Sequence, residues 1–171
     1  PRWRKQATRR LRERIKSADI DTRLADNIES MVNSQLSGRG VFIRSSTNAE
    51  DLEGFNGAGL YDTVGNVMGR KALVQAVKQV WASLWNFRAV EERELYGISH
   101  HDVYAAILIQ YGIDATAAGV LVTTNLFDPS DQNSYTINAK RGLGIRVVEG
   151  STVPEQIIFD VVNNGTKIIS R

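Results

Sequence analysis

The stretch Val41-Phe42-Ile43-Arg44-Ser45-Ser46-Thr47-Asn48-Ala49-Glu50-Asp51-Leu52 joins a short apolar run to a loop of hydroxyl and carboxyl side chains. The apolar run is typical of a buried β-strand, and it delivers Arg44 to the start of the loop. Glycines follow at positions 54, 57 and 59. Glycine permits a close backbone approach or a positive φ, so backbone N–H groups and hydroxyls here can line an anion-binding cradle. We therefore expect the chemistry of the chain in this stretch.

Arg44 is predicted to need a partner. An unpaired guanidinium at the end of a buried strand would be unfavourable, so Arg44 must meet either a carboxylate or a bound anion. Glu50 and Asp51 are close enough in sequence to supply the carboxylate. The residues alone leave both partners open. The glycines match neither the Walker A pattern nor the dinucleotide fingerprint, so no such loop is predicted.

Helical spacing of apolar residues predicts two helices before this stretch. One covers residues 4–17, and the second begins after an N-cap at Asp19 or Asp21 and ends near Gly38 and Gly40. Between residues 48 and 59 the apolar residues follow neither a helical nor a strand spacing, which predicts a loop. Further along, the pattern predicts a strand at 61–67 and two helices, one from Leu73 to Leu84 and one from Arg88 to Gly97.

The second half of the chain reads as an antiparallel sheet. The apolar run at 103–110 predicts a central strand, with 119–124 as its antiparallel neighbour. Further strands are expected at 134–139, 157–162 and 166–170, the last two joined by a hairpin turn at Asn163-Asn164-Gly165. The predicted fold class is α+β, a mainly antiparallel sheet flanked by helices.

Composition sets outer limits. The 171 residues can form one sizeable core or two small lobes. The chain contains no cysteine, which excludes disulfides and thiolate metal sites and fits a cytoplasmic protein. No apolar window is long enough for a membrane span. Because the chain begins with Pro1 and ends at Arg171 in a strand pattern, we expect it to be a truncated part of a longer polypeptide.

Charge is concentrated at the beginning of the chain. Residues 1–16 hold eight basic residues and one acid, so this segment carries about +7 while the whole chain carries +2. We treat residues 1–19 as a basic helical lead-in and favour a solvated helix packed on a neighbouring acidic domain. Nucleic-acid binding through phosphate contacts is the alternative, and no recognised nucleic-acid motif accompanies the charge.

Other residues that could carry chemistry receive structural interpretations. We expect His100 and His101 in a surface loop, and Trp81 and Trp85 in the core or at an interface between lobes. Arg88 and Arg93 are expected in ion pairs with Glu91, Glu92 and Glu94, although Arg88 could also point at a phosphate. Asp128, Asp131 and Asp160 lack the spacing of metal ligands, so we interpret them as turn and strand-end residues.

Several motifs in order resemble one family. These are Arg44 to Leu52, Ala58-Gly59-Leu60-Tyr61-Asp62-Thr63, Asn66-Val67, Val80 to Trp85 with Arg88-Ala89, Gln110, Ala118-Gly119-Val120, Gly142-Leu143-Gly144, and Val148 with Gly150 and Pro154. Together they resemble the N-terminal nucleotide-binding domain of the dikinases, which include phosphoenolpyruvate synthase, pyruvate phosphate dikinase and the glucan, water dikinases. The resemblance covers about residues 20–171.

The resemblance implies an ATP-grasp-like fold of two α+β lobes, dividing near residues 100–115, that holds ATP and Mg²⁺. In such enzymes a phosphoryl group passes from ATP to a histidine on a separate domain and then to pyruvate or a glucan. Arg44 is expected at the ATP phosphates and the loop Gly59, Leu60, Asp62 and Thr63 above them. Gln110, Tyr111 and Ile113 are expected beside the adenine.

The same resemblance places other parts outside this chain. It implies that the metal ligands, the phosphohistidine domain and the acceptor domain belong to the parent polypeptide, so no complete catalytic set and no metal ligand are predicted here. Gly112 stands where the family usually has methionine, and Ile145 stands where it usually has glutamate. No counterpart of the family's phosphate-binding lysine is found. A non-catalytic nucleotide-binding or scaffold module therefore remains an alternative function.

Overall fold

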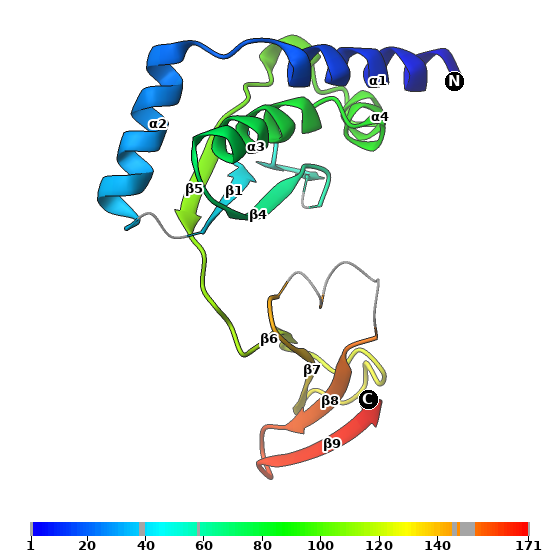
Figure 1. Ribbon diagram of the computed structural model, residues 1–171. Coiled ribbons are helices and arrows are strands. Elements are labelled where there is room, and N and C mark those ends of the chain that lie inside the picture. The colour runs from blue at the N-terminus through cyan, green and yellow to red at the C-terminus, as the bar shows by residue number, and fades with distance from the viewer. Residues whose placement is uncertain (1, 38–39, 58, 145–146, 148–152, 171) are drawn as a thin grey trace. The chain divides into compact units, whose positions relative to one another are not determined.

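The computed structural model describes residues 2–37, 40–57, 59–144, 147 and 153–170. The chain divides into two compact units, residues 1–112 and 113–171. The first contains helices α1 to α4 and strands β1 to β5, and the second contains strands β6 to β9 (Figure 1). Each unit has its own sheet, so we describe each separately.

The four predicted helices of the first unit are confirmed. They are α1 (Arg2–Ser17), α2 (Thr22–Gln35), α3 (Arg70–Ser83) and α4 (Phe87–Leu95), followed by the 3-10 turn η1 (His100–Asp102). Asp21 is the N-cap of α2, because its carboxylate accepts a hydrogen bond of 2.8 Å from the Leu24 N–H. Of the two aspartates proposed from the sequence, the structure therefore selects Asp21.

The sheet of the first unit has three antiparallel strands in the order β4-β1-β5. They are β1 (Val41–Ser45), β4 (Thr63–Val67) and β5 (Ile107–Tyr111). Successive residues of a strand point to opposite faces. In β1 this separates Val41 and Ile43, both 0% exposed, from the exposed Arg44. The sheet therefore has one core face and one open face.

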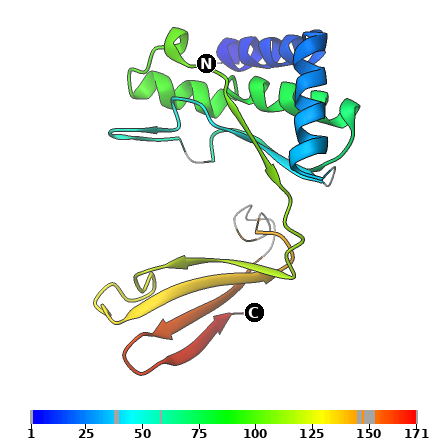
Figure 2. The same ribbon diagram turned by 90° about the vertical axis from the view of Figure 1, so that its left-hand side faces the viewer.

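Helix α3 covers the core face. Its Leu73, Val77 and Val80 form one apolar cluster with Val41 and Ile43 of β1. Helix α1 packs on α3 in turn, so helices lie in two layers over the same side of the sheet (Figures 1 and 2). A helix stripe and an alternating strand each bury one face, which is why the two elements form this core.

A second apolar cluster lies beneath the loop that follows β1. Phe55, Leu60, Tyr61, Leu84 and Ala89 are its buried members, and Trp85 packs against them. The short hairpin of β2 (Asp51–Leu52) and β3 (Phe55–Asn56) interrupts the loop predicted at residues 48–59. This cluster attaches the loop to α3 and α4.

Two expectations about β5 were wrong. It is an edge strand and not a central one, because β1 is its only partner among the described strands. Residues 119–124 do not pair with it; β6 (Ala117–Val122) belongs to the second unit and pairs with β7. The apolar run at 103–110 misled the prediction, since only its end is a strand and Leu108 within it is 50% exposed.

The second unit is a four-stranded antiparallel sheet in sequential order. Its strands are β6, β7 (Ser134–Arg141), β8 (Glu155–Asp160) and β9 (Gly165–Ser170). The hairpin predicted between the last two strands is confirmed, with Asn164 at φ 52°. The buried side chains described in this unit are all polar, namely Asn125, Ser134 and Thr136. The fold is thus α+β with antiparallel sheets, as the sequence predicts.

Some sequence expectations fall outside the described residues. Gly38, Ala58, Ile145, Val148 and Gly150 all belong to this group. Among the described helices, none combines the length and the apolar character that crossing a bilayer requires.

Candidate functional site

Arg44 lies on the open face of the first unit's sheet. It is flanked by Thr63 on β4 and by Leu108 on β5, its register partners on the two sides. All three side chains are exposed. Cross-strand partners share a face, so a cation, a hydroxyl and an apolar side chain form one row across this sheet.

The Phe42 ring supports the Arg44 side chain. Phe42 precedes Arg44 by two residues on the same face, and the guanidinium carbon lies 5.9 Å from the ring centroid. Gly65 makes room for this ring, because a Cβ at that position would lie 2.6 Å from Phe42 Cε1. The arrangement holds a guanidinium on an apolar platform while leaving its N–H donors free to meet an anion.

Gln110 lies on the same face of the sheet, two residues along β5 from Leu108. Its Cα is paired with that of Phe42, so its half-buried amide shares the open face with Arg44. Tyr111 pairs with Val41 and therefore belongs to the opposite face, and Ile113 lies in the second unit. Of the two expected base contacts that belong to β5, Gln110 and Tyr111, only Gln110 shares the face of Arg44.

The carboxylate alternative for Arg44 finds no support among the described side chains. No ion pair involving Arg44 occurs among them, and the carboxylate of Glu50 accepts a hydrogen bond of 3.3 Å from the Ser45 hydroxyl. The side chain of Asp51 lies outside the described residues. The strand has one solvent face, and Arg44 lies exposed on it.

The glycine-rich loop returns the chain toward β4. The Gly57 N–H donates to the Glu50 carbonyl at 2.7 Å, and the Leu60 N–H donates to the Gly57 carbonyl at 3.1 Å. Gly59 has φ 75°, a conformation that favours glycine because it has no side chain. Leu60 is only 5% exposed, so its side chain anchors the loop in the second cluster.

Asp62 also fixes the loop. Its carboxylate accepts hydrogen bonds from Asn86 at 2.9 Å and from Gln79 at 3.3 Å. The Asn86 amide also donates to the Leu60 carbonyl at 3.1 Å. In this predicted loop the side chains of Leu60 and Asp62 therefore hold the backbone. The Gly59 backbone and Thr63 remain exposed to a ligand.

The other hydroxyl side chains of the loop also fall into two groups, one that stabilises the loop and one that is exposed. Thr47 is 6% exposed, and its hydroxyl accepts a hydrogen bond from the Ala49 N–H at 3.3 Å. Ser46 stays exposed while its N–H donates to the Ala106 carbonyl. The Thr47 hydroxyl folds the loop, and Ser46 and Thr63 offer hydroxyls at its surface.

The structure explains why a glycine occupies position 112. Its N–H donates to the Gly40 carbonyl at 3.0 Å, and a Cβ at position 112 would lie 2.4 Å from that oxygen. A larger side chain would therefore force the two segments apart. The departure from methionine at this position accompanies a close backbone contact at the end of the sheet.

Arg93 was misread from the sequence. It is 1% exposed and donates hydrogen bonds to Tyr61, Leu84 and His100, rather than forming the expected ion pair. Its place on the buried stripe of α4 with Ala89 and Val90 was the available sign of burial. Phe42 was likewise missed as a support, although its alternation with Val41 and Ile43 placed it on the face of Arg44.

Several structural interpretations are confirmed. Trp81 and Trp85 pack against the two apolar clusters. The carboxylates of Asp128, Asp131 and Asp160 accept backbone hydrogen bonds in turns. His101 is exposed next to β5, whereas His100 bridges Arg93 and Glu94. Arg88 is 77% exposed at its side chain and lies 4.0 Å from Glu92.

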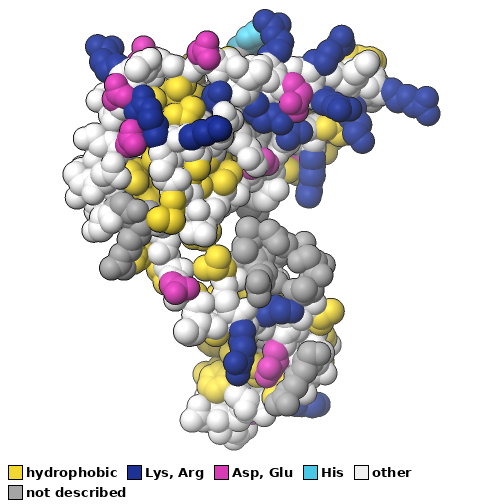
Figure 3. All heavy atoms as spheres, viewed as in Figure 1, with side chains coloured by type: hydrophobic (Ala, Val, Ile, Leu, Met, Phe, Trp, Pro, Cys, Tyr) yellow, Lys and Arg dark blue, Asp and Glu magenta, His cyan; other side chains and the backbone are white. Residues whose placement is uncertain are grey.

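The exposed cations gather on α1. Figure 3 shows Lys and Arg side chains crowded over this helix. Arg4 is an exception, since it turns inward and pairs with Glu91 at 2.7 Å and Glu94 at 3.5 Å. The hydrogen bond with Glu91 is the main cause that raises the pKa of Arg4. The acidic side chains that Arg4 meets thus belong to α4 of its own unit, whereas the expected partner was a neighbouring acidic domain.

Metal binding finds no preformed site in the described part of the chain. No three or more His, Cys, Asp or Glu side chains come together there to hold an ion. A Mg²⁺ ion that accompanies a nucleotide is usually held by one or two carboxylates together with the phosphates, which does not require such a cluster.

Residues 3–171 match the family model described as the pyruvate phosphate dikinase AMP/ATP-binding domain. Similar proteins include a probable phosphoenolpyruvate synthase of Pyrococcus abyssi, 36% identical over 155 residues, which are 88% of this chain and 19% of that protein. The phosphoenolpyruvate synthase of Pyrococcus furiosus is 35% identical over 158 residues, covering 90% and 19%. A rifampicin phosphotransferase of a Streptomyces species is 33% identical over 156 residues, covering 88% and 18%. The chain spans about a fifth of the length of these relatives.

Proposed function

The chain belongs to the pyruvate phosphate dikinase AMP/ATP-binding domain family, and on that premise we propose that it is the ATP-binding portion of a dikinase-type phosphotransferase. In this proposal a phosphoryl group passes from ATP to a histidine on another domain and then to an acceptor such as pyruvate or a glucan. Turnover belongs to the longer polypeptide, and the 171 residues supply nucleotide binding. The fold is proposed to be the ATP-grasp type.

The observation that carries the proposal is the exposed guanidinium of Arg44 on its Phe42 platform. Arginine presents N–H donors in a planar fork that matches the oxygens of a phosphate. A guanidinium without a carboxylate among its described neighbours keeps its charge available to a ligand. Phosphoryl transfer asks a protein mainly to position the phosphates and to offset their charge, which is what this arrangement can do.

The groups around Arg44 suggest which way the nucleotide lies across the sheet. We propose that the exposed Thr63 hydroxyl and the Gly59 backbone contact the phosphates beside Arg44, while Gln110 lies toward the base. Gln110 lies one strand over and two residues along from Arg44, so the two Cα atoms are separated by roughly 5 Å across the sheet and 7 Å along it. This spacing suits groups that contact different parts of one nucleotide. Tyr111 and Ile113 stay proposed base contacts.

ATP with Mg²⁺ is the expected ligand form. A magnesium ion would neutralise part of the phosphate charge when bound. The described residues contain no ligand cluster for it, so we assign no protein residue to the metal. Arg44 supplies a positive charge to the phosphates in either form.

A non-catalytic nucleotide-binding or scaffold module is the second candidate. The close contact of Gly112 with the Gly40 carbonyl favours it, because this position departs from the family's usual methionine at the proposed base end. Both candidates require ATP binding. They differ in whether phosphate transfer to a histidine-bearing domain follows.

The proposal predicts that Arg44→Ala lowers the affinity for ATP-Mg²⁺ by roughly ten- to a hundredfold, because it removes charge-assisted hydrogen bonds. Isothermal titration calorimetry of the 171-residue chain measures this effect. Arg23→Ala is the matched control, since Arg23 is an exposed arginine of α2 outside the candidate face. Equal affinities of wild type and Arg44→Ala would contradict the proposal.

A further inference from the structure

Arg93 heads the largest side chains that are fully buried among the described residues. Its guanidinium donates from Nε to His100 Nδ1 at 3.1 Å, from Nη1 to Tyr61 Oη at 3.3 Å and from Nη2 to the Leu84 carbonyl at 2.6 Å. Its central carbon also lies 5.8 Å from the centroid of the Trp85 ring. Each of the three guanidinium nitrogens therefore donates a hydrogen bond, and the group also lies over an aromatic ring.

These contacts are unusual for a buried charge. A buried guanidinium is costly to desolvate unless it is paired and hydrogen-bonded, and carboxylates are its common partners. No carboxylate contacts Arg93 directly among the described side chains. Its partners are neutral, so simple charge compensation does not explain why α4 places an arginine here. The three hydrogen bonds of Arg93 instead connect separate segments of the first unit, namely those of Tyr61, Leu84 and His100.

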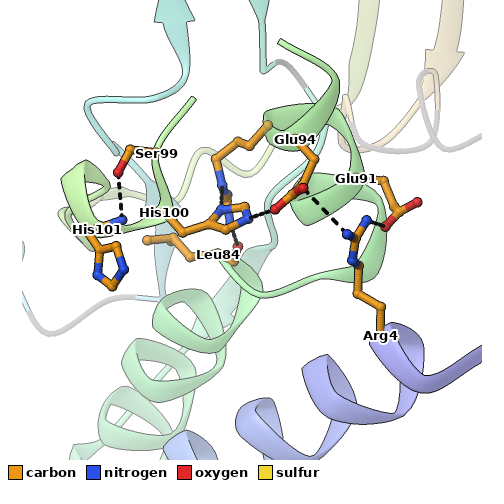
Figure 4. A network of polar contacts seen from close by, with 8 residues as sticks. Arg4, Leu84, Glu91, Glu94, Ser99, His100 and His101 are labelled. Atoms are coloured by element: carbon orange, nitrogen blue, oxygen red, sulfur yellow. Dashed lines mark hydrogen bonds and ion pairs between the residues drawn. The ribbon is translucent and has the colours of Figure 1, made fainter. Parts of the chain in front are cut away.

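His100 connects Arg93 indirectly to the carboxylate of Glu94. Because Nδ1 accepts from Arg93, the ring proton is assigned to Nε2, which lies 2.9 Å from Glu94 Oε1 and donates to it. Glu94 in turn lies 3.5 Å from Arg4 Nη2. Figure 4 shows this row of contacts from α1 to the turn at His100. The row fixes the orientation of the Arg93 guanidinium from one side.

Tyr61 continues the network toward the candidate face. It is 9% exposed, and its hydroxyl accepts from Arg93 and donates to the Ala49 carbonyl at 3.1 Å. Ala49 belongs to the loop that leaves β1 after Arg44, and Tyr61 precedes Thr63 by two residues. One hydroxyl thus ties together the two segments that flank the open face.

We infer that Arg93 is a positioning residue for the nucleotide, acting through the Tyr61 hydroxyl to hold residues 59–63 and residue 49 in register beside Arg44. This inference rests on the proposed ATP-binding function. His100 and Glu94 orient the guanidinium. The network touches no ligand itself, and its effect is to preorganise the loop, which reduces the ordering that binding would otherwise require.

The first test needs no nucleotide. Tyr61→Phe keeps the buried ring and removes only the hydroxyl, so it leaves Arg93 Nη1 and the Ala49 carbonyl without this partner. We expect amide hydrogen exchange of residues 59–63 to become about tenfold faster while α3 is unaffected. Tyr104→Phe is the control, because this tyrosine is 66% exposed and lies outside the network. Unchanged exchange in residues 59–63 would overturn the inference.

The second test measures ATP affinity by calorimetry. Tyr61→Phe and Arg93→Lys are expected to weaken ATP binding about tenfold. Val77→Ala, a truncation in the first core cluster, measures the effect of lower stability alone and is expected to leave affinity within about twofold. If Val77→Ala weakens binding as much as Tyr61→Phe, the loop is not specifically positioned by the network.

His100 supplies a rescue experiment. Asn at this position places an amide oxygen near the position of imidazole Nδ1, so His100→Asn should retain the Arg93 contact and bind ATP within about twofold of wild type. His100→Leu cannot accept a hydrogen bond and should resemble Tyr61→Phe. Equal affinities of the two variants would count against the orienting role of His100.

Failure of the inference and failure of the proposed function are distinguishable. A wild-type chain that does not bind ATP overturns the proposed function and the nucleotide part of this inference together. A wild-type chain that binds ATP, combined with unchanged exchange and affinity in Tyr61→Phe, overturns the positioning role alone.

Discussion

Gly65 controls how the Arg44 side chain is supported. A Cβ at position 65 would lie 2.6 Å from the Phe42 ring, so Gly65→Ala must displace the ring or the β4 backbone. We expect a loss of about 1 to 3 kcal/mol in the free energy of unfolding, the usual effect of overpacking, together with weaker ATP binding. Urea unfolding and calorimetry measure the two effects.

Gly144→Ala provides the comparison for that prediction. A Cβ at position 144 would lie 3.6 Å from the Ala118 Cβ, an ordinary van der Waals contact, so little change is expected. If Gly65→Ala and Gly144→Ala have equal unfolding free energies and ATP affinities, then Phe42 does not depend on the space at position 65.

Single residues also show the limit of sequence reasoning. Arg44 could be chosen because it ends an apolar run before a loop of small and polar residues. The exposure of Arg44 could not be predicted, because three consecutive apolar residues do not show which of them face the core. Arg93 was misassigned because its acidic neighbours in the sequence favour an ion pair. Its burial and its contact with Tyr61 depend on packing between segments that are distant in the sequence.

At the scale of elements, the turn between β8 and β9 depends on Asp160. The pKa of Asp160 is held below its ordinary value first by the hydrogen bond from the Asn163 side chain and then by the Asn163 N–H. A carboxyl whose pKa is lower in the folded than in the unfolded state stabilises the fold above the unfolded pKa, about 3.9. That contribution disappears as the pH falls through the lower, folded-state pKa.

Asp160→Asn is therefore expected to reduce the stability of the second unit near neutral pH and to flatten its loss of stability below pH 4. Unfolding monitored by Tyr135 fluorescence or by hydrogen exchange in β8 from pH 7 to pH 2.5 measures this. Asp114→Asn in the same unit is the control. A variant with the same pH profile as wild type would show that Asp160 does not contribute.

The elements themselves were more predictable than their partners. Helices α1 to α4 follow from apolar spacing, and the β8–β9 hairpin follows from Asn163-Asn164-Gly165, because both signals are local. The pairing of β5 with β1 joins residues more than sixty positions apart. Neither turn chemistry nor periodicity specifies such a contact, so the sequence placed β5 next to the wrong strand.

At the scale of the whole molecule, the two units differ in their cores. The buried apolar side chains of the described residues all lie between Ala25 and Val90, in the first unit. The second unit buries Asn125, Ser134 and Thr136 instead, and its sheet has 59 residues of chain to stabilise it. Small sheets that bury little apolar surface are marginally stable.

This asymmetry predicts how the units behave when they are separated. Residues 1–112 produced alone should unfold cooperatively on heating, whereas residues 113–171 alone should lack a cooperative transition. Circular dichroism and calorimetry of the two polypeptides test this difference. A sharp, calorimetrically two-state transition in residues 113–171 would contradict it.

The family assignment comes from the whole chain, since the match extends over residues 3–171. The motifs that carry the resemblance divide between both units, and the site residues of the first unit alone form the row on the open face.

The central claim is that the Arg44 guanidinium on the open sheet face binds the phosphates of ATP. The most direct measurement follows the Arg44 Nε–Hε signal by NMR while the 171-residue chain is titrated with ATP-Mg²⁺. The account predicts that this signal shifts with saturation while the signal of Arg23, an exposed arginine of α2, stays in place. A stationary Arg44 signal at saturating ATP would contradict it.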